Sequence, residues 1–199
     1  SFTEAHLPHM EISKPKAEVK KTVEKMDVAQ GKMAIGFKTN IAADSKEYPA
    51  LRVMNSIFGA GAHSKLFNNV REKLSLAYYA SSMLVRYKGL LIVNSGIEFK
   101  NFEKAYDEIL VQLENIKKGD ISDDEFNSSV SAIINSIEEA KDDQRALQKY
   151  CVAREIMRLE ADLEADKKAI LQVTKEDAAR AAQKLTLDTV YFLTGKEEA

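Results

Sequence analysis

The sequence is poor in cysteine, proline and glycine, with one, three and eight of them in 199 residues, and it has no tryptophan. A single cysteine, Cys151, excludes an internal disulfide and a cysteine-rich zinc site, and it is typical of a reducing compartment. The low glycine and proline content excludes a collagenous or low-complexity chain. No apolar run approaches the length that crosses a bilayer, and the first residues lack the apolar segment of a signal peptide. We therefore expect a globular, cytoplasmic protein that does not contact membranes.

An excess of positive charge is also missing. Lys and Arg number 29 against 31 Asp and Glu, a formal net charge of −2, so no overall basic field attracts nucleic acid or anionic lipid. Residues 88–95 resemble a strand of an RNA-recognition sheet in outline, but the positions that would stack bases hold Leu90, Ile92 and Ser95. We expect no nucleic-acid partner.

The remaining composition is that of an ordinary globular protein, with 45% hydrophobic and 30% charged residues. Residues 1–17 contain Pro8 and Pro15 without a sustained period, and we predict that they are a lead-in or an inter-domain linker. No comparable break follows in the sequence. Residues 18–199 are therefore predicted to form a single α+β domain.

Strand patterns come in pairs near the start and the middle of the chain. Segments 18–26 and 32–38 flank a glycine-containing turn and predict a β-hairpin. Segments 76–87 and 90–97 flank a tight turn at Gly89 and predict a second hairpin.

Helical spacing of apolar residues fills the rest of the sequence. Ser45 is predicted to cap a helix that ends before Gly59, and Ser64 is predicted to start another. Ser122 and Glu125 have the spacing of a capping box. The other predicted elements are helices at 102–116, 144–159, 161–172 and 174–185 and a closing strand at 189–194. This order predicts an antiparallel sheet with helices packed on one face, containing a split β-α-β unit of the ferredoxin-like kind.

Neither H-E-x-x-H nor H-x-x-E-H, the zinc motifs of metallopeptidases, occurs in the sequence. His6 and His9 flank Pro8, which prevents a helix from presenting both histidines on one face. His63 stands in a loop with no nucleophile motif beside it, and we expect it to be exposed or to cap a helix. Cys151 lies in a helical stripe and is expected to be a buried apolar residue. No catalytic residue and no metal ligand are predicted in this chain.

Residues 59–82 combine a glycine-rich turn, an amphipathic helix that contains Arg71, and a strand entered through Tyr78. This segment resembles the zinc-free C-terminal domain found in halves of pitrilysin/insulinase family zinc metallopeptidases. The residues in register with that family's pattern are Ser64, Leu66, Phe67, Val70, Arg71, Glu72, Leu76, Ala77, Tyr78 and Ser82. Segments 121–126, 173–177 and 191–195 continue the resemblance, which spans about residues 19–195.

The resemblance implies a metallopeptidase-half fold and a substrate-binding role for Arg71 and Tyr78. In the family, an arginine and a tyrosine at this spacing face the zinc across a closed chamber and contact the substrate near its scissile carbonyl. A guanidinium or phenol hydroxyl aimed at the carbonyl oxygen stabilises the negative charge that develops there. The resemblance also implies that a zinc-bearing domain or subunit of the same family holds the zinc, in a homo- or hetero-oligomer. The layout is similar to that of inactive bacterial members that depend on such a subunit, so we expect this chain alone to hydrolyse no peptide.

Two alternatives stay open at this point. Arg71 could simply pair with Glu72 or cap a carbonyl, and Tyr78 could be a half-buried strand aromatic. The chain could then be a catalytically inactive scaffold or assembly subunit of the same fold. The sequence does not say whether a zinc motif lies elsewhere in a longer chain or on another subunit.

Overall fold

The structure of the protein is a computed structural model, which describes residues 18–157 and 162–196. The predicted lead-in at 1–17, including His6 and His9, lies outside the described residues.

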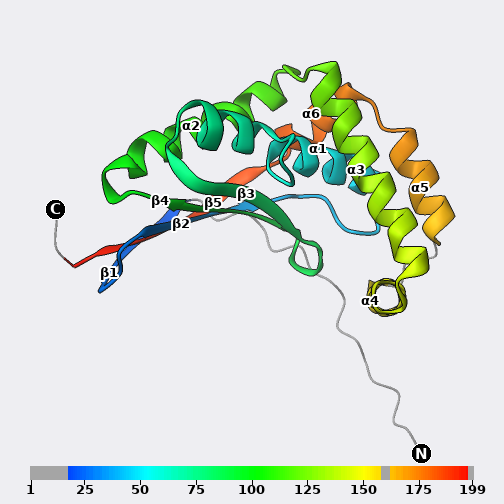
Figure 1. Ribbon diagram of the computed structural model, residues 1–199. Coiled ribbons are helices and arrows are strands. Elements are labelled where there is room, and N and C mark those ends of the chain that lie inside the picture. Colours follow the sequence, from blue (N-terminus) through cyan, green and yellow to red (C-terminus); the bar gives the residue numbers. More distant parts are fainter. Residues whose placement is uncertain (1–17, 158–161, 197–199) are drawn as a thin grey trace, which may run out of the picture.

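A five-stranded sheet runs through the domain in the order β1-β5-β2-β4-β3 (Figure 1). The strands are β1 (Lys20–Met26), β2 (Gly31–Lys38), β3 (Ala77–Val85), β4 (Leu90–Ile97) and β5 (Thr186–Gly195). The predicted β3–β4 hairpin is confirmed: the two strands pair antiparallel, and Gly89 closes the turn in the left-handed region at φ 59°.

The predicted hairpin of β1 and β2 is wrong, because β5 lies between the two strands. β5 pairs antiparallel with β2 and parallel with β1, so the sheet is mixed rather than wholly antiparallel. The difference in composition between β1 and β5 explains why β5, and not β1, lies beside β2. β5 carries Val190 and Phe192, which are buried, whereas β1 is almost entirely exposed and rich in lysine. A charged strand is tolerated at a sheet edge and protects that edge from further pairing.

The helices are α1 (Tyr48–Phe58), α2 (Phe102–Lys117), α3 (Asp123–Asp142), α4 (Gln144–Met157), α5 (Leu163–Leu171) and α6 (Lys175–Gln183). All of these except α4 gather on one face of the sheet, as predicted (Figure 1). Alternate residues of β2, namely Met33, Ile35 and Phe37, are buried beneath them. The domain is therefore α+β, with its core between the sheet and α1. None of the helices in the described ranges is long and apolar enough to cross a membrane.

Helix starts follow the sequence closely, with one exception. Ser122 and Glu125 form the predicted capping box, and Thr174 caps α6 in the same way. Ser45, however, does not cap α1. The N-cap is Glu47, and the Ser45 hydroxyl accepts a hydrogen bond from the backbone N–H of Glu47 in the preceding turn.

Cys151 is exposed, which contradicts its predicted burial. Its helix, α4, lies beyond the group of helices that covers the sheet (Figure 1). Leu147, Val152 and Ile156 of the same helix are also exposed. The apolar spacing along α4 indicates a helix correctly, but this helix packs too little of its surface for the pattern to mean burial.

Candidate functional site

A glycine turn fastens α1 to the edge strand β3. The carbonyl of Gly59 accepts a hydrogen bond from the backbone N–H of Ser82 at 2.9 Å, and the Ser82 hydroxyl donates to Oδ1 of Asn55 at 2.8 Å. A Cβ added at Gly59 would lie 2.6 Å from the Ser82 nitrogen and 2.8 Å from Cδ1 of Leu66. The residue at position 59 must therefore be glycine for the turn, β3 and the following helix to meet.

The helix after this turn is a π-helix over Leu66–Lys73, where the sequence predicts an ordinary α-helix. Leu66 and Val70 are fully buried, and Asn69 donates a hydrogen bond to Gln112 of α2 at 2.9 Å. The helix is thus held both to the core and to α2. π-Helical geometry is rare and is found frequently at functional sites.

Two further departures from regular backbone follow before β3 is established. Ser75 has φ 49°, in the left-handed region. The register of β3 against β4 then shifts between Ala77 and Tyr79, so Tyr78 occupies a bulge without a cross-strand partner. Bulges change the direction of a side chain and are common next to active sites. Residues 66–78, which we call the junction, therefore concentrate three irregular features.

The junction presents both predicted site residues to solvent. Tyr78 is 59% exposed, and among the residues that the structure describes its hydroxyl has no hydrogen-bond partner. The Arg71 side chain is 43% exposed, with Nε 3.5 Å from Glu72 and its guanidinium over the Phe67 ring at 4.8 Å. The pairing of Arg71 with Glu72 is thus real, but an exposed ion pair of this kind contributes little stability. Tyr78 is exposed rather than half-buried.

His63 contacts a residue that sequence reasoning missed. Its Nε2 lies 3.1 Å from the hydroxyl of Ser56, which is buried in α1. His63 is partly buried and joins the turn to α1, so the expectation of an exposed or capping residue is only half right. The seven-residue separation gives no sequence signal, because the contact depends on how the turn folds back. No carboxylate contacts this pair among the described residues, so it lacks the third group of a hydrolase triad.

Burial lowers the pKa of His63 below its ordinary value of 6.5. The stability of the protein should therefore depend on pH through this residue. Protonation of this group favours the unfolded state, so its contribution to stability is complete above pH 6.5 and declines as the pH falls toward the lower, folded-state pKa. We expect the free energy of unfolding, measured by urea denaturation, to fall more between pH 7.5 and 5.5 in the unmodified protein than in His63→Gln. An equal fall in both proteins would contradict this role.

No group of three His, Cys, Asp or Glu side chains that could hold a metal ion occurs in the described residues. The histidines His6 and His9 lie outside them. The two predicted site residues of the junction, Arg71 and Tyr78, are hydrogen-bond donors rather than common zinc ligands, so this pair suits recognition of an oxygen atom.

Comparison with known proteins identifies the family. Residues 4–133 match the family model described as the peptidase M16 inactive domain. The chain belongs to this family. The M16 inactive domain is the zinc-free metallopeptidase domain that the sequence resembles, so the resemblance is confirmed.

Individual relatives agree with the assignment. The chain is 44% identical over 184 residues to the probable inactive metalloprotease YmfF of Bacillus subtilis, covering 92% of this chain and 43% of that protein. It is 26% identical over 128 residues to the uncharacterized zinc protease YmxG of the same organism, covering 63% of this chain and 31% of that protein. A solved structure of a conserved protein from Enterococcus faecalis matches with a TM-score of 0.88 and 33% identity, over 94% of this chain and 44% of that one. This M16 inactive domain thus spans less than half the length of each of these relatives.

Proposed function

We propose that this M16 inactive domain forms the substrate-facing, zinc-free side of a peptidase chamber and takes part in peptide hydrolysis together with a zinc-bearing domain or subunit. The observation that carries the proposal is the junction. Two exposed hydrogen-bond donors, Arg71 and Tyr78, stand on a segment whose backbone is irregular in three places and is anchored to the core at Leu66 and Val70. An irregular backbone held rigidly in this way is typical of a binding site.

The two side chains suit recognition of a peptide carbonyl. During hydrolysis of a peptide bond, negative charge develops on the carbonyl oxygen, and fixed donors aimed at that oxygen stabilise the transition state. The Tyr78 hydroxyl is available to donate, and the Arg71 guanidinium keeps free N–H groups beyond its contact with Glu72. In this proposal both groups act only as hydrogen-bond donors. The zinc and the remaining chemistry of hydrolysis are assigned to the partner.

A second candidate function is that of a catalytically inactive scaffold or assembly subunit. It is favoured by the description of the family as an inactive domain and by the name of YmfF as an inactive metalloprotease. Both functions share the fold, so only activity in the assembled state separates them.

Reconstitution tests the proposed function. We expect the chain alone to bind no stoichiometric zinc after dialysis and to hydrolyse no peptide. The full-length protein mixed with a zinc-bearing family member should hydrolyse a quenched fluorescent peptide faster than the zinc-bearing member alone. Metal analysis and initial rates provide the measurements. One tightly bound zinc per chain would contradict the assignment of the metal to the partner, and an unchanged rate in the mixture would favour the scaffold function.

A further inference from the structure

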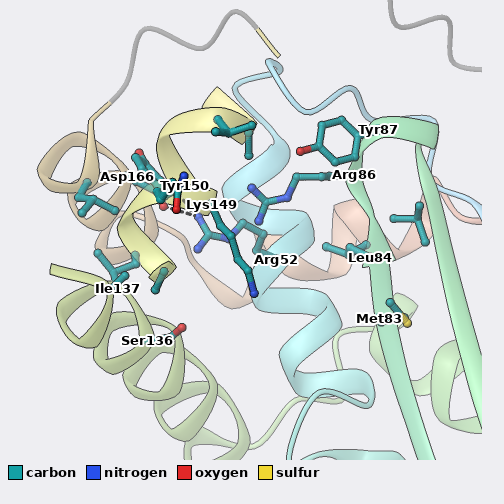
Figure 2. Close-up of a pocket in the computed structure, with 17 residues that line it drawn as sticks. Arg52, Met83, Leu84, Arg86, Tyr87, Ser136, Ile137, Lys149, Tyr150 and Asp166 are labelled. Atoms are coloured by element: carbon teal, nitrogen blue, oxygen red, sulfur yellow. Dashed lines mark hydrogen bonds and ion pairs between the residues drawn. The ribbon is translucent and has the colours of Figure 1, made fainter. Parts of the chain in front are cut away.

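A cavity of about 800 Å³ lies at the other end of β3 from the junction, and Figure 2 shows the side chains that line it. Its walls come from α1, the end of β3, the turn that follows β3, and α3, α4 and α5. No residue of the junction lines it. The volume is within the range of cavities that enclose small ligands or short segments of a partner.

Three cationic side chains line this cavity, against one carboxylate: Arg52, Arg86 and Lys149 against Asp166. We call it the basic cavity. Nη1 of Arg52 lies 2.5 and 2.7 Å from the two carboxylate oxygens of Asp166, so this carboxylate is already engaged. Within residues 18–157 and 162–196, neither Arg86 nor Lys149 has an ion pair. Figure 2 shows the Arg86 side chain extending toward Arg52, whereas the Lys149 ammonium ends away from the Arg52 guanidinium.

Arg86 lies near a buried tyrosine. Burial raises the pKa of the Tyr48 hydroxyl, and the positive charge of Arg86 offsets part of that rise. A smaller cavity of about 300 Å³, lined by Tyr48, Arg52 and Arg86 among others, adjoins the first. Cations gathered in one cavity repel one another unless an anion neutralises them.

The other walls of the basic cavity are apolar. They include Met83 and Leu84 of β3, Ile137 of α3, Val152 of α4 and Leu163 of α5. A free inorganic anion would neutralise the cationic side chains but would leave the apolar walls exposed to water. A ligand with a carboxylate between apolar groups matches both the charge and the walls.

We propose that the basic cavity binds an acidic peptide segment, in which a carboxylate side chain flanked by apolar residues pairs with Arg86 and Lys149. The ligand class rests on the proposed function, since a chamber that cleaves peptides presents peptide chains to this domain. The cations come from α1, the turn after β3 and α4, and the cavity opens to solvent. This arrangement suits an internal segment that passes across the cavity. The basic cavity would then anchor a substrate at a distance from the junction.

Fluorescence polarisation on the full-length protein tests this site without zinc and without hydrolysis. The probe is a labelled short peptide of alternating leucine and glutamate with an amidated C-terminus, and its leucine and glutamine counterpart is the neutral control. We expect the acidic peptide to bind at least tenfold more tightly than the neutral one. Lys149→Gln and Arg86→Gln should each weaken its binding about tenfold, because each removes a charge-assisted contact.

Each matched control variant removes one positive charge from a neighbouring residue that does not line the basic cavity. Arg145→Gln lies on the same helix as Lys149, and Lys88→Gln lies on the same turn as Arg86; neither residue lines the cavity. Both should leave the affinity unchanged. Melting curves identify any variant that fails to fold, and Lys149→Gln is the safer test because Lys149 is exposed.

Two outcomes would overturn the proposal. They are equal binding of the two peptides, and affinity that falls equally in the matched variants. Each of these would leave the proposed function intact, because the junction and the reconstituted activity do not depend on this cavity. Conversely, specific binding of the acidic peptide in a protein without reconstituted activity would separate the basic cavity from peptidase function.

Discussion

Tyr78→Phe is expected to lower the rate of peptide hydrolysis about a hundredfold in the full-length protein assembled with the zinc-bearing partner proposed above. The variant keeps the aromatic ring and loses only the hydroxyl. Removing one donor that stabilises negative charge on a carbonyl oxygen costs on the order of 3 kcal/mol in the transition state. The same hydroxyl has no hydrogen-bond partner within the described residues, so its loss should barely change the free energy of unfolding. A large effect on rate with little effect on stability therefore identifies a substrate contact.

Tyr79→Phe is the matched control. The Tyr79 ring lies directly over Gly96 of the neighbouring strand, where a Cβ would come within 2.4 Å of its Cε1. It is also exposed, but it lies in regular register rather than in the bulge. We expect Tyr79→Phe, which also loses only a hydroxyl, to leave the rate of hydrolysis unchanged.

Arg71→Ala should lower hydrolysis to a similar extent, with Lys73→Ala on the same π-helix as its control. The exposed contact of Arg71 with Glu72 contributes well under 1 kcal/mol of stability, so folding should survive. Initial rates and urea denaturation of all four variants provide the comparison. Normal hydrolysis in both Tyr78→Phe and Arg71→Ala would remove these residues from the active site and would favour the scaffold function.

Local patterns in the sequence were enough to predict the element order. The capping boxes at Ser122 and Thr174, the turn at Gly89 and the apolar stripes of α2 and α3 are all encoded within a few residues. The place of β1 was not predictable in this way. Its partner β5 is separated from it by nearly the whole chain, and the competition between β1 and β5 for the position beside β2 is decided by packing against the helices.

The candidate site was predicted only in part. Arg71 and Tyr78 come from the family resemblance, since an exposed arginine and an exposed tyrosine carry no signal by themselves. The π-helix has the same spacing of Leu66 and Val70 as an α-helix would, and a bulge at Tyr78 leaves no trace in the alternation of the strand. The basic cavity was missed altogether, because Arg52 and Asp166 are 114 positions apart.

Gly59→Ala is expected to lower the free energy of unfolding by about 2 to 3 kcal/mol, a typical cost of forcing an extra methyl group into a filled space. The new Cβ would meet the backbone nitrogen of Ser82 at 2.6 Å and Cδ1 of Leu66 at 2.8 Å. A backbone atom cannot rotate away, so either the turn or β3 has to move. Gly36→Ala is the matched control, because its Cβ would find Thr189 at 3.8 Å, an ordinary contact distance. We expect it to change stability by no more than about 0.5 kcal/mol.

The same substitution also tests how the junction is held in place. Gly59 contacts both elements that carry the site, since Leu66 begins the π-helix of Arg71 and Ser82 lies in the strand of Tyr78. A shift of either element misaligns the two donors that the proposed function directs at the substrate carbonyl, and misplacement by about 1 Å is enough to lower a rate a hundredfold. Gly59→Ala should therefore reduce hydrolysis by the assembled protein even at temperatures where the variant stays folded, whereas Gly36→Ala should not. A folded Gly59→Ala protein with an unchanged rate would show that catalysis does not depend on the geometry of the junction.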